Sequence, residues 1–290
     1  MTANKPTNLK QRSWTSAIAI SVISILFFFS HHEVLQYFVA ASIIIAIATA
    51  HWEFCLLLKK RGYNPSTKTS ITCGVFYLTA SFLGSHFSSL QHAPLLAFIL
   101  SFFLFFLQNF SRNEQSIANI ASISLGFIYV PVSLSLLLTI LYSFPENDLS
   151  SGKWWCIYLI AVTKITDIGA FLVGSKLGRY KITSYISPEK TLEGSIGGCL
   201  FSVAMGIFFH FLSLKYPSST FTLSLGQSIL LSLFLSISAQ IGDLAESLLK
   251  RDAKVKDSNN IPGLGGMLDM FDSLIFTTPI IYFFLEVTIK

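Results

Sequence analysis

The chain has 290 residues and a net charge of +5, and 52% of its residues are hydrophobic whereas only 12% are charged. Soluble domains usually carry about 25% charged residues, so this composition excludes an ordinary soluble globular domain. The positive balance suits an anionic membrane surface, and the absence of any aromatic-rich basic repeat argues against a nucleic-acid partner.

Apolar runs follow one another along the chain, each near the roughly 20 residues that a membrane-spanning helix needs. We expect helices at 13–30, 34–58, 69–90, 93–110, 118–142, 154–174, 195–213, 221–245 and 272–289. The predicted fold is therefore all-α, a polytopic integral membrane protein with about nine transmembrane helices.

The positions of Lys and Arg predict how these helices are oriented. With a cytoplasmic N-terminus and nine alternating spans, 16 of the 20 Lys and Arg residues fall in cytoplasmic segments, three fall outside, and Lys164 lies within a helix. This asymmetry fits the positive-inside rule. We therefore expect the N-terminus and the polar segments 175–194 and 246–271 to be cytoplasmic.

The character of the chain changes near residue 150. Residues 1–150 have few charges within their helices and are expected to form a transmembrane scaffold, whereas residues 151–290 hold both long polar segments and are expected to form the working region. No internal repeat is evident, which argues against the inverted-repeat architecture of many transporters. The four cysteines all fall in apolar runs and are expected to be buried free thiols: Cys55, Cys73, Cys156 and Cys199.

The first candidate site lies at the end of the eighth expected helix. Asp243, Glu246, Ser247 and Lys250 fall at i, i+3, i+4 and i+7, so they share one helical face. An acid at the membrane boundary costs several kcal/mol unless it meets a polar cavity, a cation or a partner. An Asp–Lys pair near the interface is the alternative that the spacing leaves open.

Further acids begin the ninth expected helix. Asp269 and Asp272 share a face there, after a segment, 262–266, that reads Pro-Gly-Leu-Gly-Gly and lets a backbone approach a ligand closely. The two acids could simply complement the helix dipole. With Asp243, however, they would make three carboxylates, which suit Mg²⁺ and substrate phosphates. Basic residues that could neutralise a polyphosphate stand beside them: Lys250, Arg251, Lys254 and Lys256.

The segment around 164–194 is the second polar region. Lys164 and Asp167 lie within the sixth expected helix, either as an internal ion pair or as part of a site. The stretch Ser187-Pro188-Glu189-Lys190-Thr191 could be only a turn before a helix cap. Its basic neighbours could equally be a second phosphate-binding cluster or only part of the positive-inside signal: Lys176, Arg179, Lys181 and Lys190.

Three motifs in order resemble one known family. They are DIGAFLVGSKLG, SPEKTLEGSIGG and SLLKRDAKVKDSNNIPGLGGMLDMFDS, and they resemble the signatures of the phosphatidate cytidylyltransferases, or CDP-diacylglycerol synthases. The resemblance is specific over about 160–280 and only general before that.

The resemblance implies a bacterial-type inner (plasma) membrane enzyme that transfers a cytidylyl group from CTP to phosphatidic acid, with its active site facing the cytoplasm. It implies Mg²⁺, to which a second, monovalent cation could be added, and it is compatible with a homodimer. The catalytic residues that it implies are Asp243, Lys250, Arg251, Asp269 and Asp272, with the three aspartates holding the metal. The residues expected to contact substrate are Ser187, Lys190, Thr191, Lys256 and Asp257.

Two positions depart from the family pattern. Leu264 stands where the family usually has His, and Met270 stands where it usually has Arg. An inactive family member is therefore one alternative. The others are a CDP-alcohol phosphotransferase, whose D-G-x-x-A-R core is missing here, and an ion-coupled transporter using Lys164, Asp167 and Asp243 as a relay.

Overall fold

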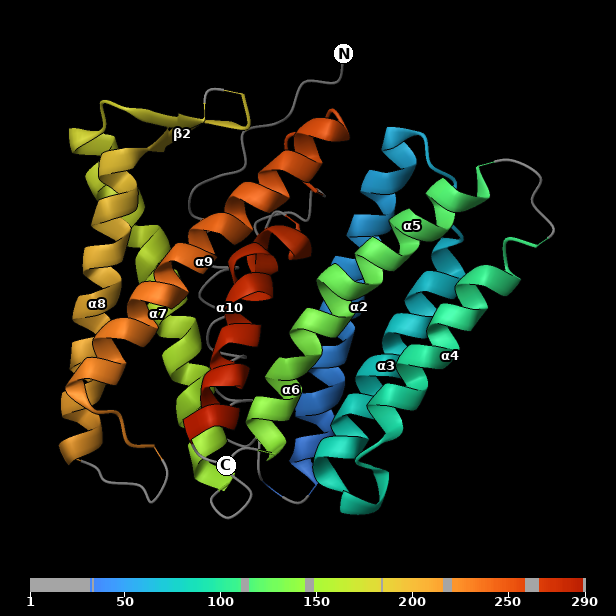
Figure 1. Ribbon diagram of the computed structural model, residues 1–290, viewed down its shortest axis with the longest axis horizontal. Coiled ribbons are helices and arrows are strands. Elements are labelled where there is room, and N and C mark those ends of the chain that lie inside the picture. The colour runs from blue at the N-terminus through green and yellow to red at the C-terminus, as the bar shows by residue number, and fades with distance from the viewer. Residues whose placement is uncertain are drawn as a thin grey trace.

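The computed structural model describes residues 32, 34–110, 115–143, 149–183, 185–215, 221–258 and 266–288. The expected all-α fold is confirmed, and eight of the expected helical runs correspond to described helices, while the first, 13–30, lies outside the described residues. The elements in Figure 1 are α2 (Leu35–Arg61), α3 (Thr67–His86), η1 (Ser88–Leu90), α4 (Ala93–Leu107), α5 (Ser116–Phe127), η2 (Ile128–Val132), α6 (Ser133–Ser143), α7 (Leu149–Leu177), β1 (Lys181–Thr183), β2 (Ser187–Thr191), α8 (Leu192–Lys215), α9 (Leu225–Asp252) and α10 (Met267–Thr288).

Within the described residues, seven helical segments are long and apolar enough to cross a bilayer. They are α2, η1 with α4, α5 continued through η2 into α6, α7, α8, α9 and α10. The 20-residue helix α3 is the eighth long helix, packed against α2, α4 and α6. The total of nine spans and the side of the N-terminus stay predictions.

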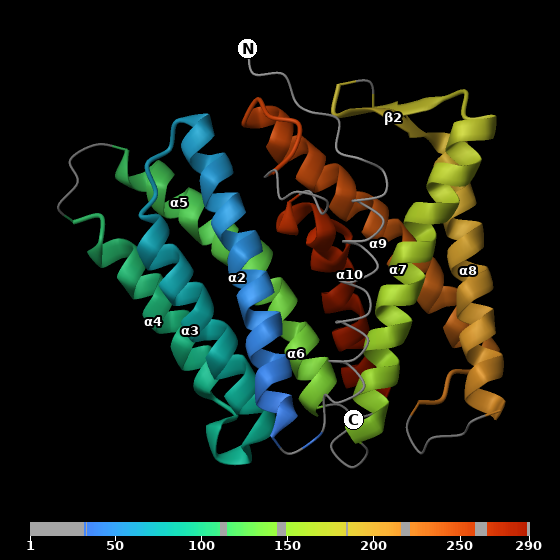
Figure 2. The same cartoon turned by 180° about the vertical axis from the view of Figure 1, so that it is seen from behind.

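The helices form two groups joined by α10. Figures 1 and 2 show α2 to α6 on one side of the molecule and α7 to α9 on the other, with α10 between them. Helix α10 contacts α2 and α6 from the first group and α7 and α9 from the second. One buried apolar cluster accordingly extends from α2 to α10, so the two groups share a core.

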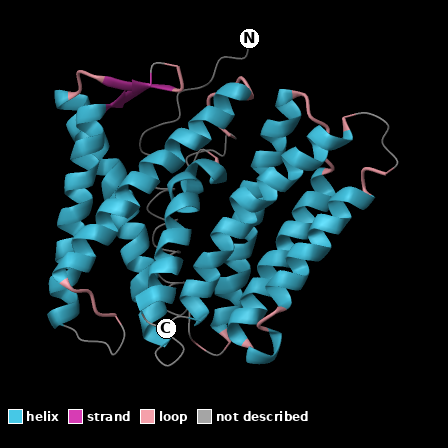
Figure 3. Cartoon of the chain, viewed as in Figure 1, coloured by secondary structure: helices cyan, strands magenta, loops and turns pink. Residues whose placement is uncertain are grey.

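The polar segments gather at one end of the bundle. The C-terminal ends of α2, α7 and α9 lie at the end that also carries the two strands (Figure 3). The strands pair antiparallel, with Lys181 opposite Thr191 and Thr183 opposite Ser187. This small sheet was not expected from the sequence, and it forms in a polar stretch beyond the membrane-spanning helices, where water can solvate its unpaired edges.

Small residues let α7 and α8 pack closely, which explains the glycines in two of the sequence motifs. A Cβ atom on Gly194 would lie 2.8 Å from the carbonyl oxygen of Ala170 and 3.1 Å from the Cα of Gly174. A Cβ atom on Gly197 would lie 2.5 Å from the Cβ of Val173. Such small-residue contacts are how membrane helices approach each other without a hydrophobic driving force.

A glycine also brings α9 against α10 at the level of the candidate site. A Cβ atom on Gly242 would lie 2.6 Å from the carbonyl oxygen of Asp272 and 3.2 Å from the Cα of Ser273. The acids of α9 therefore lie directly beside those of α10.

Helix α9 starts at a capping box between Ser224 and Gln227, and Lys254 follows its end in the left-handed conformation (φ 56°).

Candidate active site

The last turns of α9 and the first turns of α10 present a cluster of carboxyl groups. One oxygen each of Asp243, Glu246 and Asp272 lie within 4.8 Å of one another. Glu246 is fully buried and Asp272 is 9% exposed, and Ser273 Oγ donates to Asp272 Oδ1 over 2.8 Å. We call Asp243, Glu246 and Asp272 the acidic cluster.

Asp269, the third aspartate expected to ligate a metal, has different contacts. Its Oδ1 accepts a hydrogen bond from Lys250 Nζ over 2.9 Å, and its Oδ2 accepts one from the backbone N–H of Gly266 over 3.0 Å. Lys250 also forms an ion pair with Glu246. Asp269 thus caps the start of α10 and lies next to the acidic cluster, with Lys250 paired to both Asp269 and Glu246.

The β-hairpin brings a second lysine to the cluster. Lys190 on β2 forms an ion pair with Asp243, with 2.5 Å between its Nζ and Oδ2. Arg251 Nε donates to the carbonyl oxygen of Ile186 over 3.2 Å, which ties the end of α9 to the hairpin. Thr191 Oγ1 accepts from the backbone N–H of Gly194 over 3.2 Å, so the helix cap considered from the sequence is present.

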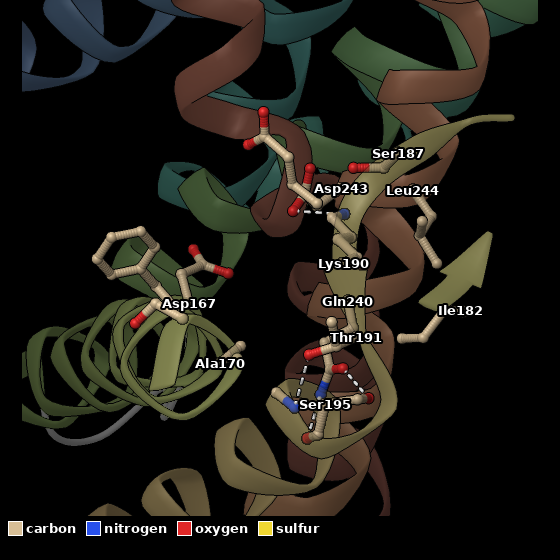
Figure 4. Close-up of a pocket in the computed structure, with 15 residues that line it drawn as sticks. Asp167, Ala170, Ile182, Ser187, Lys190, Thr191, Ser195, Gln240, Asp243 and Leu244 are labelled. Atoms are coloured by element: carbon tan, nitrogen blue, oxygen red, sulfur yellow. Dashed lines mark hydrogen bonds and ion pairs between the residues drawn. The ribbon is translucent and has the colours of Figure 1, made fainter. Parts of the chain in front are cut away.

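A pocket of about 580 Å³ opens beside the acidic cluster, and Asp243 belongs to both (Figure 4). In Figure 4, Asp167 projects from α7 on one side, opposite Lys190 and Thr191 of β2 and Gln240 of α9. Ser187 also lines the pocket, so all three hairpin residues expected to contact substrate border it. Its apolar lining includes Phe171, a residue that is 73% exposed, and Leu244.

The remaining expected residues lie further out. Lys256 and Asp257 are exposed in the segment after α9. Leu264 lies outside the described residues. Met270 is half-buried, and its carbonyl oxygen accepts a hydrogen bond from Lys164 Nζ over 3.3 Å. Lys164 Nζ lies 3.7 Å from Asp167 Oδ2, so the ion pair within α7 that the sequence left open is also formed.

Sequence reasoning gave no site role to two residues that the structure places here. Glu246 shares the predicted face of Asp243 and Lys250, and its position between them was the signal that could have identified it. Gln240 lies one turn before Asp243, lines the pocket and donates to the carbonyl oxygen of Ser195 over 3.3 Å. A lone Gln in an apolar helix gives little indication of such a role.

The acidic cluster has the chemistry of a divalent cation site. Hard divalent cations prefer carboxylate oxygens, and oxygens on opposite sides of a six-coordinate Mg²⁺ lie about 4 Å apart. A spread of 4.8 Å for three carboxylates approaches that spacing. Lys190 and Lys250 supply two positive charges against four carboxylates, those of the cluster and Asp269, which leaves two negative charges for a cation to balance. The residues present therefore fit such a group.

Comparison with known proteins shows the family. Residues 10–288 match the cytidylyltransferase family. The chain is 35% identical over 205 residues to a phosphatidate cytidylyltransferase of Chlamydia muridarum, a match that covers 68% of this chain and 66% of that protein, just under two thirds of its length. It is 32% identical over 250 residues to one from Chlamydia pneumoniae, covering 83% of this chain and 80% of the relative. It is 31% identical over 296 residues to one from Synechocystis sp., covering 93% and 96%. The resemblance stated from the motifs is thereby confirmed: the chain belongs to the cytidylyltransferase family.

Proposed function

We propose that this membrane protein transfers a cytidylyl group from CTP to phosphatidic acid, which yields CDP-diacylglycerol and pyrophosphate for phospholipid synthesis. The observation that carries the proposal is the acidic cluster beside a lysine-bordered pocket, in a chain of the cytidylyltransferase family. Relatives over most of the chain are named phosphatidate cytidylyltransferases, which supports both substrates.

The reaction places little demand on general acid or general base catalysis. An oxygen of the lipid phosphate forms a bond with the α-phosphorus of CTP, the bond from that phosphorus to the bridging oxygen breaks, and pyrophosphate leaves with the electron pair. Because the lipid phosphate is already anionic, no general base is required. Catalysis then depends on positioning the two phosphates and neutralising their charge.

We assign the acidic cluster to the binding of Mg²⁺. Bound there, Mg²⁺ would neutralise charge on the nucleotide phosphates. Lys190 and Lys250 each contact an acid of the cluster and are placed to contact phosphate oxygens beside it. Asp269 holds Lys250 in place in this proposal, instead of ligating the metal. Arg251, Lys256 and Asp257 follow at the end of α9, toward water.

The position of the pocket suits two substrates of opposite polarity. It is bordered by polar groups of the hairpin at the end of the bundle and by apolar side chains of α7 and α9. CTP would enter from water and phosphatidic acid from the bilayer, past Phe171. We place this end in the cytoplasm, because the basic segments gather there. A homodimer stays a prediction, which light scattering of the detergent-solubilised protein would test.

The test is turnover by the purified protein with phosphatidate in mixed micelles. CTP or dCTP should support product formation at least about tenfold better than ATP, and chelation of Mg²⁺ should abolish it. Diacylglycerol, which lacks the attacking phosphate, should not replace phosphatidate. Equal rates with ATP and CTP would contradict the nucleotide assignment, and a folded protein without turnover would support the inactive alternative.

A further inference from the structure

Glu53 links the first half of the chain to the candidate active site. It lies on α2, inside an apolar run, and is fully buried. Its Oε2 accepts a hydrogen bond from Ser258 Oγ over 3.0 Å and another from the backbone N–H of Leu268 over 2.8 Å. Ser258 follows α9 and Leu268 lies in the first turn of α10. One oxygen atom of Glu53 is therefore hydrogen-bonded to the segment that precedes residues 259–265 and to the segment that follows them.

These contacts continue into the active site. The Leu268 N–H is one of the amides that a helix leaves without an intrahelical partner, and here another helix supplies the acceptor. The next residue, Asp269, accepts from Gly266 N–H and holds Lys250. An unbroken series of contacts thus runs from Glu53 through the first turn of α10 to Lys250 and Glu246.

Close packing at Gly266 shows how tightly this junction is built. A Cβ atom there would lie 1.7 Å from Ser258 Oγ, 2.7 Å from Asp269 Oδ2 and 2.9 Å from Glu53 Oε2. Only glycine leaves room for the three polar groups to converge. The start of α10 therefore has little freedom to move relative to α2 and the end of α9.

Glu53 differs from another buried polar residue of α2, His51, in which part of the molecule its hydrogen bonds reach. His51, also fully buried, exchanges a hydrogen bond of 2.8 Å with Ser70 of α3, inside the first group of helices. Both hydrogen bonds of Glu53 go instead to the segments that flank the α9–α10 connection. Burying a carboxyl group in a membrane helix is costly, and groups retained despite that cost usually mark functional regions.

We propose that Glu53 is a positioning residue, which fixes the first turn of α10 against α9 and so sets the place of Asp272 relative to Asp243 and Glu246. This rests on the proposed function, because it takes the acidic cluster to be the Mg²⁺ site. Glu53 acts through Leu268 N–H and Ser258 and is not itself a ligand. Groups that position metal ligands without binding the metal themselves typically change metal affinity when they are lost.

The test compares Glu53→Ala and Glu53→Gln by two readouts: Mn²⁺ binding, followed by the electron paramagnetic resonance signal of the free ion, and the Mg²⁺ concentration for half-maximal turnover. Glu53→Ala should weaken Mn²⁺ binding and raise that Mg²⁺ concentration by about 10- to 100-fold. In Glu53→Gln both readouts should stay within about threefold of their wild-type values. One oxygen of Glu53 accepts both hydrogen bonds, and the Gln side chain still has one such oxygen. Glu53→Gln failing as badly as Glu53→Ala would show that the charge is required and would overturn the positioning role.

Ser70→Ala is the matched control, since it removes one buried hydrogen bond made by α2 without touching α10. It should lower the melting temperature and leave Mn²⁺ binding unchanged. Glu53→Ala behaving in the same way, with normal Mn²⁺ binding, would overturn the inference. If Glu53→Ala does not fold, Ser258→Ala removes one of the two hydrogen bonds and should shift both readouts in the same direction by less; unchanged Mn²⁺ binding there would overturn the inference.

The wild-type protein separates this inference from the proposed function. Wild-type protein that neither binds Mn²⁺ nor turns over CTP would refute the proposed function, and with it the basis of the inference. Wild-type protein that does both, beside a Glu53→Ala variant that matches it in both, would refute the inference alone.

Discussion

Asp272 carries the charge on which the proposed site depends most directly. Its carboxyl group is nearly buried, accepts a hydrogen bond from Ser273 and lies with Asp243 and Glu246 in the acidic cluster. A carboxylate that only complements a helix dipole contributes about 0.3–1 kcal/mol and can stand at the surface. Burial among other acids is costly without a cation, so Asp272 is the residue to change first.

Asp272→Asn keeps the shape of the side chain and removes its charge. Metal neutralisation of phosphoryl charge is worth several kcal/mol, so turnover should fall at least about a hundredfold, at roughly 1.4 kcal/mol per tenfold. Glu286→Gln, at the other end of α10 where Glu286 accepts from Tyr282, is the control and should leave turnover unchanged. A folded Asp272→Asn protein with more than about a tenth of wild-type turnover would contradict the metal assignment.

Lys190 offers a second test, because it pairs with Asp243 at the pocket. Hydrogen bonds to charged groups contribute about 1.5–3 kcal/mol, so Lys190→Met should lower kcat/KM for CTP by about tenfold or more. Lys190→Arg keeps the charge and should lose less. Lys176→Met, a matched change at an exposed position of α7, should have no effect. Equal losses in Lys190→Met and Lys176→Met would mean that only the overall charge of this surface matters.

At this scale the sequence predicts which residues share a face, but not which partner each one takes. Helical spacing places Asp243, Glu246 and Lys250 together, and the structure does the same. Spacing also puts Asp269 beside Asp272, yet Asp269 turns to Lys250 and Gly266 N–H. Glu53 could not be assigned, because its partners lie more than 200 positions further along the chain.

At the scale of elements, the site depends on how closely α9 approaches α10. Gly242 allows that approach, since any side chain there would meet the backbone of Asp272. The hydrophobic runs 221–245 and 272–289 predict that both helices exist, but α9 continues to Asp252 and α10 begins at Met267, so the polar turns that carry the site extend beyond the runs. They do not predict the β-hairpin, whose short polar strands lack the apolar alternation typical of strands. Nor do they predict the π-helical turn η2, which forms where Pro131 lacks the N–H of a regular helix.

Gly242→Ala should push α9 and α10 apart and separate Asp243 from Asp272. We expect turnover to fall at least about tenfold, because overpacking a tight interface costs about 1–3 kcal/mol and displaces the carboxylates. Gly226→Ala on the same helix, where a Cβ atom meets nothing within 4 Å, is the control and should be neutral or slightly stabilising. Turnover in Gly242→Ala equal to that in Gly226→Ala would show that the α9–α10 spacing does not matter.

At the scale of the whole molecule, α10 joins two groups of helices into one core and carries part of the site. We propose that residues 1–150 act as the scaffold for the catalytic region, and Glu53 is one of the contacts through which they reach it, together with the ion pair between Arg61 and Asp252. The basic segments lie at one end of the bundle, and the positive-inside rule predicts that this end faces the cytoplasm.

Cysteine labelling tests the orientation. After replacement of Cys55, Cys73, Cys156 and Cys199, a Lys256→Cys variant should react with a membrane-impermeant reagent only from the cytoplasmic side. Lys215→Cys, at the opposite end of α8, should react only from the other side. The two positions are exposed at opposite ends of the bundle, so each is the control for the other. Labelling of residue 256 from outside alone would reverse the topology and place the site on the wrong face.

The central claim is that the cytidylyl group itself moves from CTP to the lipid phosphate. The most direct measurement uses the wild-type protein in phosphatidate-containing vesicles with Mg²⁺ and CTP labelled at either the α- or the γ-phosphate. The α-label should appear in the lipid fraction as CDP-diacylglycerol, while the γ-label should stay in water as pyrophosphate, in equal amounts. Transfer of the γ-label to lipid, or release of pyrophosphate without a labelled lipid, would contradict it.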